Sequence, residues 1–294
     1  MAYESELEFA IETARLAGKF LMENFGSQHD PQWTAETKET NFKIVMDKRS
    51  DDLIRTRIKQ SFPEDDIYSE EAEDIDRGRV RSWTFDPIDG TEPYANHTSN
   101  NWSVAIALIE NNNPVLGVVY MPQRQELYRA VSGNGAFCND IPIKVSREIS
   151  LNKVRMAVDG GKKLAGWYDA STLNILKNKI EPSIAIPLAF GCASVPLCQV
   201  ASGTPDPRLP TAGKIEAYMG GALEPWDMAA EVPIIREAKG IVTNLSGREW
   251  RFSKYKQGDP TILAANPVLH QILKDYLAPE IEDYYSKNGF SKYK

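Results

Sequence analysis

Three strand-like segments follow one another closely in the first half of this 294-residue chain. Residues Ser103–Ile109, Val115–Tyr120 and Leu127–Val131 are rich in aliphatic side chains, and turn residues such as Asn111–Pro114 separate them. Connections this short join antiparallel neighbours, because a parallel pair needs a crossover of about a dozen residues or more. The spacing therefore predicts an antiparallel meander, preceded by a further strand at Trp83–Phe85.

Two helical patterns precede the meander. Apolar residues at alternating spacings of three and four predict a first helix that stops at Gly26, a residue suited to the end of a helix. A second helix is expected over about residues 48–62, with Pro63 just beyond its end. The apolar positions that support the two helices are Leu7, Ile11, Ala14, Gly18, Leu21 and Phe25, and then Ile54, Ile58 and Phe62.

The second half of the chain alternates between strand-like and helical segments, which is typical of an α/β unit. The expected helices cover residues 168–178, 192–202 and 227–239, and a last one begins with Asn266 as its N-cap. The expected strands cover residues 154–158, 183–186, 217–219, 241–244 and 261–265. We expect an α+β half over residues 1–150 with the antiparallel sheet, and an α/β half over residues 151–294, together forming one compact catalytic unit.

Composition excludes several classes of function. The formal net charge is −7, so the protein has no general attraction for nucleic acid or for an anionic membrane. No apolar run reaches the roughly 18 residues needed to span a bilayer. The three cysteines, Cys138, Cys192 and Cys198, form no CxxC pair, which argues against a disulfide framework or a zinc cluster and favours a cytoplasmic location. An acidic protein that acts on an anionic substrate needs a cation between the two.

The run Asp86–Thr91 contains several potential ligand groups within six residues. Two carboxylates, Asp86 and Asp89, follow a strand, and Pro87 stiffens the expected turn. Such hard oxygen ligands suit Mg²⁺, and N–H groups after the turn can hold a phosphate. From the spacing alone, a surface Asx-turn has about equal weight with a metal site.

Three further acids are open to two interpretations each. Glu70 follows the short apolar segment Ile67–Tyr68, so it is either an inward ligand or part of a solvated acidic face. Asp227 begins a helix, where the helix dipole favours an acid with or without a metal. Asp47 precedes the second helix and is either an N-cap or a functional carboxylate.

Taken together, these motifs resemble the inositol monophosphatase family of Mg²⁺-dependent, Li⁺-sensitive phosphatases over roughly residues 5–277. The similarity lies in Glu-Glu at 70–71, Asp-Pro-Ile-Asp-Gly-Thr at 86–91, and Trp-Asp with a helix that ends in Glu-Ala-x-Gly at 226–240, in that order. The resemblance implies a layered α/β/α/β/α sandwich of the inositol monophosphatase and fructose-1,6-bisphosphatase type.

The resemblance also implies a site of two or three Mg²⁺ ions, with Mn²⁺ as a possible substitute. The first metal would be held by Glu70, Asp86 and the Ile88 carbonyl. The second would be held by Asp86, Asp89 and Asp227, and a third, weaker one would lie near Glu70. The catalytic group would include Glu70, with Thr91 and Asp47 activating the attacking water. The backbone N–H groups of Gly90 and Thr91, together with Asp89, would contact the phosphate.

The substrate side departs from the family pattern. Gly191-Cys192-Ala193 matches a substrate-lining Gly-[Ser/Thr]-Ala segment, but with Cys in the middle. Gly220 stands where inositol-selective members carry a Glu that contacts sugar hydroxyls. The loops expected over 92–101 and 204–215 are longer than in inositol enzymes, and residues 224–235 look more like the histidinol-phosphate phosphatase branch.

The sequence thus predicts Mg²⁺-dependent hydrolysis of a small phosphate monoester. Histidinol phosphate, fructose 1,6-bisphosphate and 3′-phosphoadenosine 5′-phosphate are alternative substrates to an inositol phosphate. A non-catalytic metal- or phosphate-binding regulator is the alternative from another class. The expected partner is a small phosphorylated metabolite rather than nucleic acid or a membrane, and family resemblance implies a homodimer.

Overall fold

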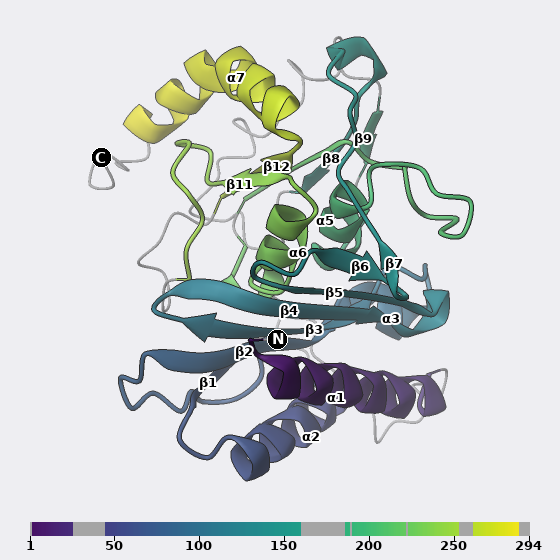
Figure 1. Cartoon of the computed structure of the whole chain (residues 1–294), viewed down its shortest axis with the longest axis vertical. Coiled ribbons are helices and arrows are strands. Elements are labelled where there is room, and N and C mark those ends of the chain that lie inside the picture. Colours follow the sequence, from purple (N-terminus) through teal and green to yellow (C-terminus); the bar gives the residue numbers. More distant parts are fainter. Residues whose placement is uncertain are drawn as a thin grey trace.

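The computed structural model describes residues 2–25, 45–159, 186–188, 190–221, 223–252 and 261–287. These residues form five layers, in which two sheets alternate with three layers of helices (Figure 1). The expected α/β/α/β/α sandwich is confirmed. The helix expected over residues 168–178 lies outside the described residues.

The first sheet contains the predicted meander. β1 is parallel to β2, and each later strand pairs antiparallel with the one before it. The strands lie in sequence order across the sheet, as short connections require. They are β1 (Asp66–Ser69), β2 (Arg81–Asp89), β3 (Ser103–Glu110), β4 (Asn113–Met121), β5 (Glu126–Val131), β6 (Ala136–Cys138) and β7 (Ile141–Pro142).

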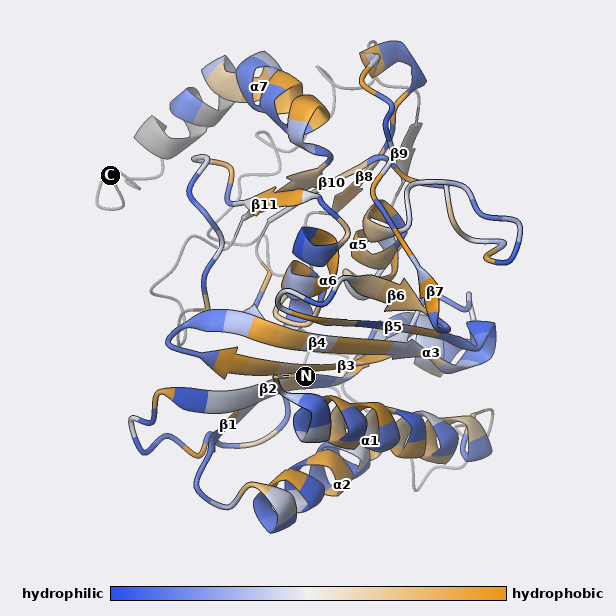
Figure 2. Cartoon of the chain, viewed as in Figure 1, coloured by the Kyte–Doolittle hydropathy of each residue, from blue (hydrophilic) through white to orange (hydrophobic). Residues whose placement is uncertain are grey.

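Two helices cover the outer face of this sheet, α1 (Glu4–Glu23) and α2 (Val45–Ser61). Of the predicted apolar stripe of α1, Ala14, Gly18 and Leu21 are buried against the sheet, whereas Leu7 and Ile11 are half-buried. Ala17, which the pattern did not include, is also fully buried. Figure 2 shows the polar residues of α1 on its other side. Together the helices and the sheet enclose one of the three clusters of buried apolar residues in the part of the chain that the structure describes.

A second sheet lies beyond a middle layer of helices. Its strand order is β11-β12-β10-β8-β9, and α7 (Pro267–Lys287) covers its far side (Figure 1). The Asn266 side chain accepts a hydrogen bond from the Leu269 N–H at 2.9 Å, so the predicted N-cap is confirmed. The strands are β8 (Arg155–Asp159), β9 (Ile186–Leu188), β10 (Ala217–Gly220), β11 (Ile241–Thr243) and β12 (Ile262–Ala265).

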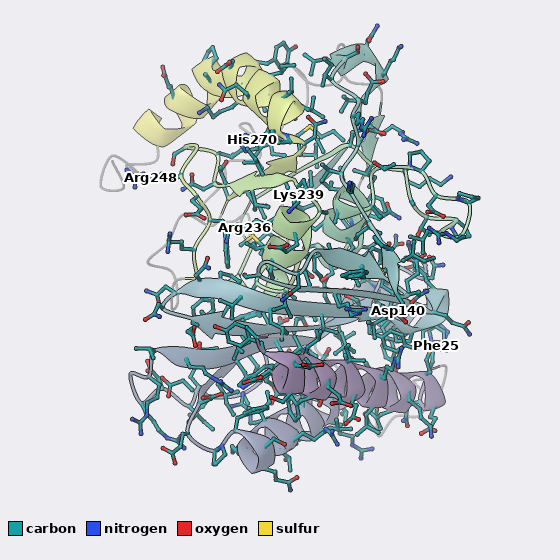
Figure 3. The ribbon with its side chains drawn as sticks, in the orientation of Figure 1. Phe25, Asp140, Arg236, Lys239, Arg248 and His270 are labelled. Carbon is teal, nitrogen blue, oxygen red and sulfur yellow. The ribbon has the colours of Figure 1, made fainter. Side chains whose placement is uncertain are left out.

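The middle layer consists of α5 (Ser194–Ala201) and α6 (Glu231–Glu237), which pack against each other between the two sheets. At the end of α6, the Arg236 guanidinium donates to the Asn113 side chain at 3.0 Å and to the Trp250 carbonyl at 2.6 Å (Figure 3). These bonds tie α6 to β4 on one side and to the loop after β11 on the other. The middle layer is therefore anchored to both sheets.

Two predicted segments differ from the structure. The helix expected over 227–239 is divided into a 3₁₀ turn, η5 (Pro225–Asp227), and α6, which begins at Glu231. Pro233 explains the division, because a proline fits the first turn of a helix, where its missing N–H costs nothing, but not the interior. The polar segment expected as a loop over 92–101 instead begins with a short helix, α3 (Thr91–Asn96).

The three cysteines are buried, and none of them forms a disulfide with another. Burial raises the pKa of the Cys138 thiol to about 12 and that of Cys198 well above its ordinary value. A thiol that stays protonated is a poor nucleophile and a poor metal ligand, so these two side chains act as small apolar residues of the core. Among the described residues, no helix is long and apolar enough to cross a membrane.

Gly117 of β4 allows the middle layer to approach the first sheet. A Cβ atom at this position would lie 1.9 Å from the Ala230 carbonyl oxygen and 2.9 Å from the Pro233 ring. We expect Gly117→Ala to lower the free energy of unfolding by about 1–3 kcal/mol or more, because β4 and α6 must separate.

Urea unfolding of Gly117→Ala beside Gly133→Ala measures this effect. Gly133 has a φ of 85° and open space around a Cβ atom, so its substitution reports backbone strain alone. An equal loss of stability in both variants would contradict the packing explanation.

Candidate metal centre

Glu70 and Asp86 come from neighbouring parallel strands. In the register of β1 and β2, Ser69 pairs with Phe85, so the next residues, Glu70 and Asp86, are also neighbours. Successive side chains of a strand point to opposite faces of its sheet. Because Phe85 packs under the outer helices, Asp86 faces the middle layer.

A bulge in β2 brings Asp89 to the same face as Asp86. Residues three apart in a regular strand point to opposite faces. Here Asp86 pairs with Ala105 and Asp89 with Ser103, so three steps of β2 match two steps of β3. The additional residue in β2 shifts the alternation of side chains by one position, so Asp89 points to the same face of the sheet as Asp86. The turn predicted at Pro87 is wrong, because the strand continues through Pro87 to Asp89.

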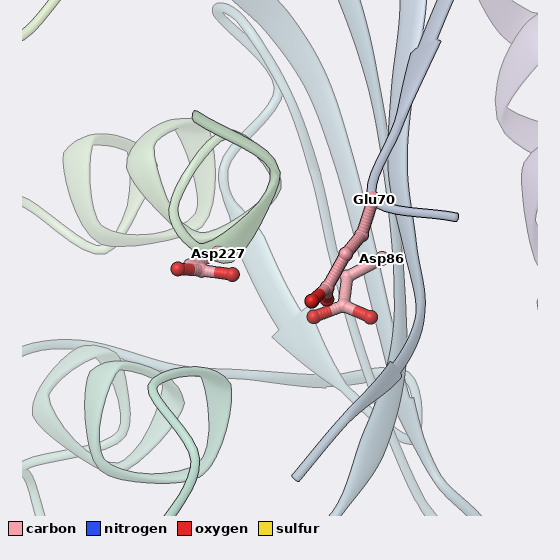
Figure 4. Close-up of side chains that lie close together, drawn as sticks. All are labelled: Glu70, Asp86 and Asp227. Carbon is pink, nitrogen blue, oxygen red and sulfur yellow. The ribbon is translucent and has the colours of Figure 1, made fainter. Parts of the chain in front are cut away.

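Asp227 reaches the same place from the middle layer. It ends η5, which packs against β2 and β3, and its Oδ2 accepts a hydrogen bond from the Glu224 N–H at 2.8 Å. One carboxylate oxygen from each of Glu70, Asp86 and Asp227 lies within 4.8 Å of the other two. Figure 4 shows Glu70 and Asp86 extending from the sheet toward Asp227 on the helical turn opposite.

Asp89 lies outside this group of three and is held by the start of α5. Its Oδ2 accepts a hydrogen bond from the Ser194 N–H at 2.6 Å, and its Oδ1 accepts one from the Ala193 N–H at 3.2 Å. The first N–H groups of a helix have no partner within the helix, and an acid at that end is favoured by the helix dipole. The carboxylate of Asp89 is thereby fixed in orientation.

Asp47 and Thr91 meet at the edge of the cluster. The Thr91 hydroxyl donates to Asp47 Oδ1 and to the Ile88 carbonyl oxygen, each at 3.2 Å. Asp47 is buried in the first turn of α2, and the Ser50 hydroxyl one turn later donates to the Pro87 carbonyl at 3.3 Å. The start of α2 is thus attached to the bulge that carries the acidic residues.

The residue before Glu70 is held by a buried ion pair. The Arg55 guanidinium donates to Asp51 at 2.9 Å, and the Ser69 hydroxyl contacts both of these side chains. All three residues are at most 7% exposed. A charged pair that is desolvated and fully hydrogen-bonded holds one geometry, so the end of β1 presents Glu70 in a defined direction.

Gly90 and the segment Gly191–Ala193 are in close contact. Gly90 has a φ of 91°, and a Cβ atom there would lie 2.5 Å from the Asn101 carbonyl oxygen and 2.9 Å from Cys192 Cβ. Glycine is therefore required both by backbone conformation and by packing. The predicted phosphate-binding and substrate-lining segments are placed against each other, although the sequence separates them by about a hundred residues.

Gly220 lies at the buried end of β10. A Cβ atom at this position would lie 2.8 Å from the Tyr218 ring and hydroxyl and 2.9 Å from Leu223 Cδ1. The side chain of Tyr218 therefore occupies the space into which a longer residue at position 220 would project.

The electrostatics of the site fit a bound cation. Burial raises the pKa of Asp86 well above the ordinary carboxyl value, and neighbouring charges raise it further. In order of size, these charges are Glu70, Asp89, Asp227 and Asp47. Burial first, and then Glu70 and Asp89, also raise the pKa of the Asp227 carboxyl, although the residue keeps some exposed surface. Carboxylates that oppose one another's ionisation supply the oxygen ligands and negative charge that Mg²⁺ or Mn²⁺ prefers.

The profile of the inositol monophosphatase family matches residues 2–286 of the chain. The chain belongs to this family. Fructose-1,6-bisphosphatase/inositol-1-monophosphatase of Aquifex aeolicus is 32% identical, over 92% of the chain and 96% of the relative. Inositol-1-monophosphatase of Bacillus subtilis is 29% identical, over 83% of the chain and 87% of the relative. Putative Nus factor SuhB of Neisseria meningitidis is 31% identical, over 91% of the chain and 96% of the relative.

Solved structures of this family share the fold. The extragenic suppressor protein suhB from Bartonella henselae superposes with a TM-score of 0.80 at 26% identity, covering 93% of this chain and 98% of that one. Inositol monophosphatase II of Staphylococcus aureus with inositol monophosphate bound superposes with a TM-score of 0.75 at 26% identity, covering 96% of this chain and 98% of that one. The same protein has also been solved with 2′-AMP bound.

Glu231 is a buried acid beside this site that the sequence analysis missed. It is fully buried at the start of α6, one turn after Asp227. Its signal in the sequence was a Glu between Met228, Val232 and Ile235, on the apolar face of a helical segment. An acid in that position is either paired or protonated.

Asp86→Asn tests the electrostatic description of the site. In the folded protein the pKa of Asp86 lies above its unfolded value, so stability is lost as the pH rises through the raised pKa. Without divalent cations, we expect the Asn variant to have a higher Tm than the native protein at about pH 8, and the difference to shrink at about pH 5.

The Tm of both proteins is then measured again with Mg²⁺ added. Mg²⁺ should raise the Tm of the native protein, because the cation binds the folded state and not the unfolded chain, and leave the Asn variant nearly unchanged. A lower Tm of the metal-free Asn variant at about pH 8 would mean that Asp86 is a structural residue.

Proposed function

We propose that the protein is a Mg²⁺-dependent phosphatase that hydrolyses a small phosphate monoester. The observation that carries this proposal is the group of Glu70, Asp86 and Asp227 oxygens within 4.8 Å of one another, in a chain of the inositol monophosphatase family. A bound pair of divalent cations would supply Lewis-acid activation of water and neutralise charge on the phosphate. The rest of the reaction depends on how the protein positions its own groups.

The proposed ligands divide into two sets that share Asp86. Glu70, Asp86 and the Ile88 carbonyl would hold one cation, and Asp86, Asp89 and Asp227 the other. Asp86 is suited to be the shared ligand, because Glu70, Asp89 and Asp227 are all close enough to raise its pKa. A third cation near Glu70, and Mn²⁺ in place of Mg²⁺, belong to the same proposal.

Thr91 and Asp47 are proposed to orient the attacking water. The single proton of the Thr91 hydroxyl can be donated to either Asp47 or the Ile88 carbonyl, so the lone pairs of the hydroxyl can accept a hydrogen bond from water. The water oxygen then forms a bond to phosphorus while the bond from phosphorus to the ester oxygen breaks. The proton lost by water passes through Thr91 to the Asp47 carboxylate, and the leaving alkoxide takes a proton from solvent.

The phosphate itself would be held by the backbone N–H groups of Gly90 and Thr91, at the start of α3. The left-handed conformation of Gly90 and the absence of a side chain allow the ligand to approach the backbone closely. Gly191, Cys192 and Ala193 pack against this turn and are proposed to line the substrate pocket.

The identity of the substrate depends on Gly220 in this proposal. Position 220 carries no carboxylate to accept hydrogen bonds from sugar hydroxyls, and a Glu there would project into the space that Tyr218 fills. We infer that myo-inositol 1-phosphate is not the preferred substrate. Histidinol phosphate, fructose 1,6-bisphosphate and 3′-phosphoadenosine 5′-phosphate are the alternatives.

A regulatory role is the second candidate function, because some relatives are named Nus factors. Intact Glu70, Asp86, Asp89, Thr91 and Asp227 favour the enzyme instead. A protein that only binds a partner gains nothing from buried carboxylates that repel one another.

Phosphate release from a generic aryl phosphate tests the activity. We expect turnover at millimolar Mg²⁺, loss of turnover with a chelator, and inhibition by Li⁺. Asp86→Asn serves as the inactive control. Absence of Mg²⁺-dependent phosphate release from well-folded protein would refute the enzyme and favour the regulatory role.

A comparison of kcat/KM across the four named substrates tests the role assigned to Gly220. We expect myo-inositol 1-phosphate to rank below the preferred substrate by about tenfold or more, the usual effect of an unmade hydrogen bond in a specificity pocket. The highest kcat/KM for myo-inositol 1-phosphate would contradict this assignment.

Thr91→Ala tests the water-orienting role. We expect kcat to fall by about 10²–10⁴-fold, since a positioned proton-transfer group typically contributes that much, with little change in Mg²⁺ affinity. Thr91→Ser keeps the hydroxyl and should recover most of the activity. Equal kcat values for the Ala and Ser variants would show that the hydroxyl has no part in catalysis.

A further inference from the structure

Glu231 and Ser194 form a buried polar pair between α5 and α6. The Ser194 hydroxyl donates to Glu231 Oε1 at 2.5 Å, and both side chains are completely buried. The other carboxyl oxygen, Oε2, is buried without a hydrogen-bond partner among the described residues. A buried polar group that has one partner costs stability, so its retention calls for a functional explanation.

Ser194 connects this pair to the metal centre. Its backbone N–H donates to Asp89 Oδ2 at 2.6 Å, while its hydroxyl donates to Glu231. The preceding residue, Ala193, donates to the other oxygen of Asp89. Ser194, the first residue of α5, is therefore hydrogen-bonded to Glu231 through its side chain and to Asp89 through its backbone.

The charge state of Glu231 suits this position. Burial raises its pKa to about 8, the nearby Asp89 charge also raises it, and the Ser194 hydroxyl lowers it. At neutral pH the carboxyl is therefore mostly protonated. A neutral Glu231 can accept from Ser194 without adding a further negative charge behind a cluster of acids that already repel one another.

We propose that Glu231 is a positioning residue for Asp89, acting through Ser194. The inference rests on the proposed function, in which Asp89 is a ligand of the second cation. Groups that orient metal ligands are typically worth 10–100-fold in metal affinity or activity, because a ligand that is free to rotate binds less tightly. Glu231 itself touches neither the cation nor the substrate in this arrangement.

Mn²⁺ binding to the full chain, followed by EPR, tests the proposal independently of turnover. We expect Glu231→Ala and Ser194→Ala each to weaken binding at the site that includes Asp89 by about tenfold. Glu231→Gln should bind Mn²⁺ nearly as the native protein does, since its amide oxygen can accept from Ser194. The double variant Ser194→Ala/Glu231→Ala should be no weaker than either single variant, because the two residues act in one chain of contacts.

Glu237→Gln is the matched control. Glu237 lies in the same helix, and its carboxylate also accepts two hydrogen bonds, from the Gly133 and Gly135 N–H groups at 2.8 Å each. Among the described residues its carboxylate has no hydrogen bond to α5, so its substitution should leave Mn²⁺ affinity unchanged. Circular dichroism and Tm establish that each variant is folded, and Ser194→Ala carries the test if Glu231→Ala does not fold.

Three results would overturn the proposal, and they are distinguishable. If the native protein binds Mn²⁺ and releases phosphate while folded Ser194→Ala and Glu231→Ala do so equally well, the pair is structural and the proposed function stands. If the native protein neither binds Mn²⁺ nor releases phosphate, the proposed function and this inference fail together. A weakened Glu231→Ala that Glu231→Gln does not rescue would also contradict the proposed contact.

Discussion

The geometry of the acidic cluster depends on one constraint, the mutual repulsion of carboxylates that lie close together. Asp86 lies at the centre of five acids, and each of the other four raises its pKa. Part of this cost is offset by backbone N–H groups: Ile88 donates to Asp86 at 2.9 Å, Glu224 donates to Asp227, and the start of α5 donates to Asp89. In the proposed function a divalent cation would relieve the remaining cost, so the same repulsion would both favour metal binding and lower the stability of the metal-free protein.

The layered fold is what makes such a cluster possible. Glu70, Asp86 and Asp89 come from one sheet, and Asp227 comes from the helical layer that packs on that sheet. Close packing at Gly117 and the Arg236 contacts fix the distance between these layers. The geometry of the candidate site therefore depends on residues outside the acidic cluster, as expected where a rigid scaffold positions a small number of functional groups.

Much of the architecture could be predicted from local pattern. The strands β3, β4 and β5 were recognisable because short aliphatic runs between turn residues have few other interpretations. The helix α3 has only six residues, too few for a periodic pattern to predict its extent. Pro233 was the one local sign of the division before Glu231, because the apolar stripe continues through it. Only a family resemblance implied the stacking of two sheets, since no local pattern encodes which faces meet.

In the candidate site too, local sequence pattern predicted some features, and others depend on contacts between distant segments. The Asp86–Thr91 run was visible as a dense group of oxygen ligands, and the structure brings it together with Glu70, Asp47 and Asp227. The bulge that turns Asp86 and Asp89 to one face depends on pairing with β3 and has no signature within the run itself. The pairing of Ser194 with Glu231 joins residues 37 positions apart, and polar residues in apolar segments give a weak signal until their contacts are known.

The central claim is that these carboxylates hold divalent cations with Asp86 shared between two of them. Anomalous diffraction from crystals of the full chain grown with Mn²⁺ tests it most directly. The account predicts two or three anomalous peaks in the acidic cluster, with Asp86 contacting two ions, Glu70 contacting one and Asp227 the other. An empty cluster at millimolar Mn²⁺, or a single ion bound without Asp86, would contradict it.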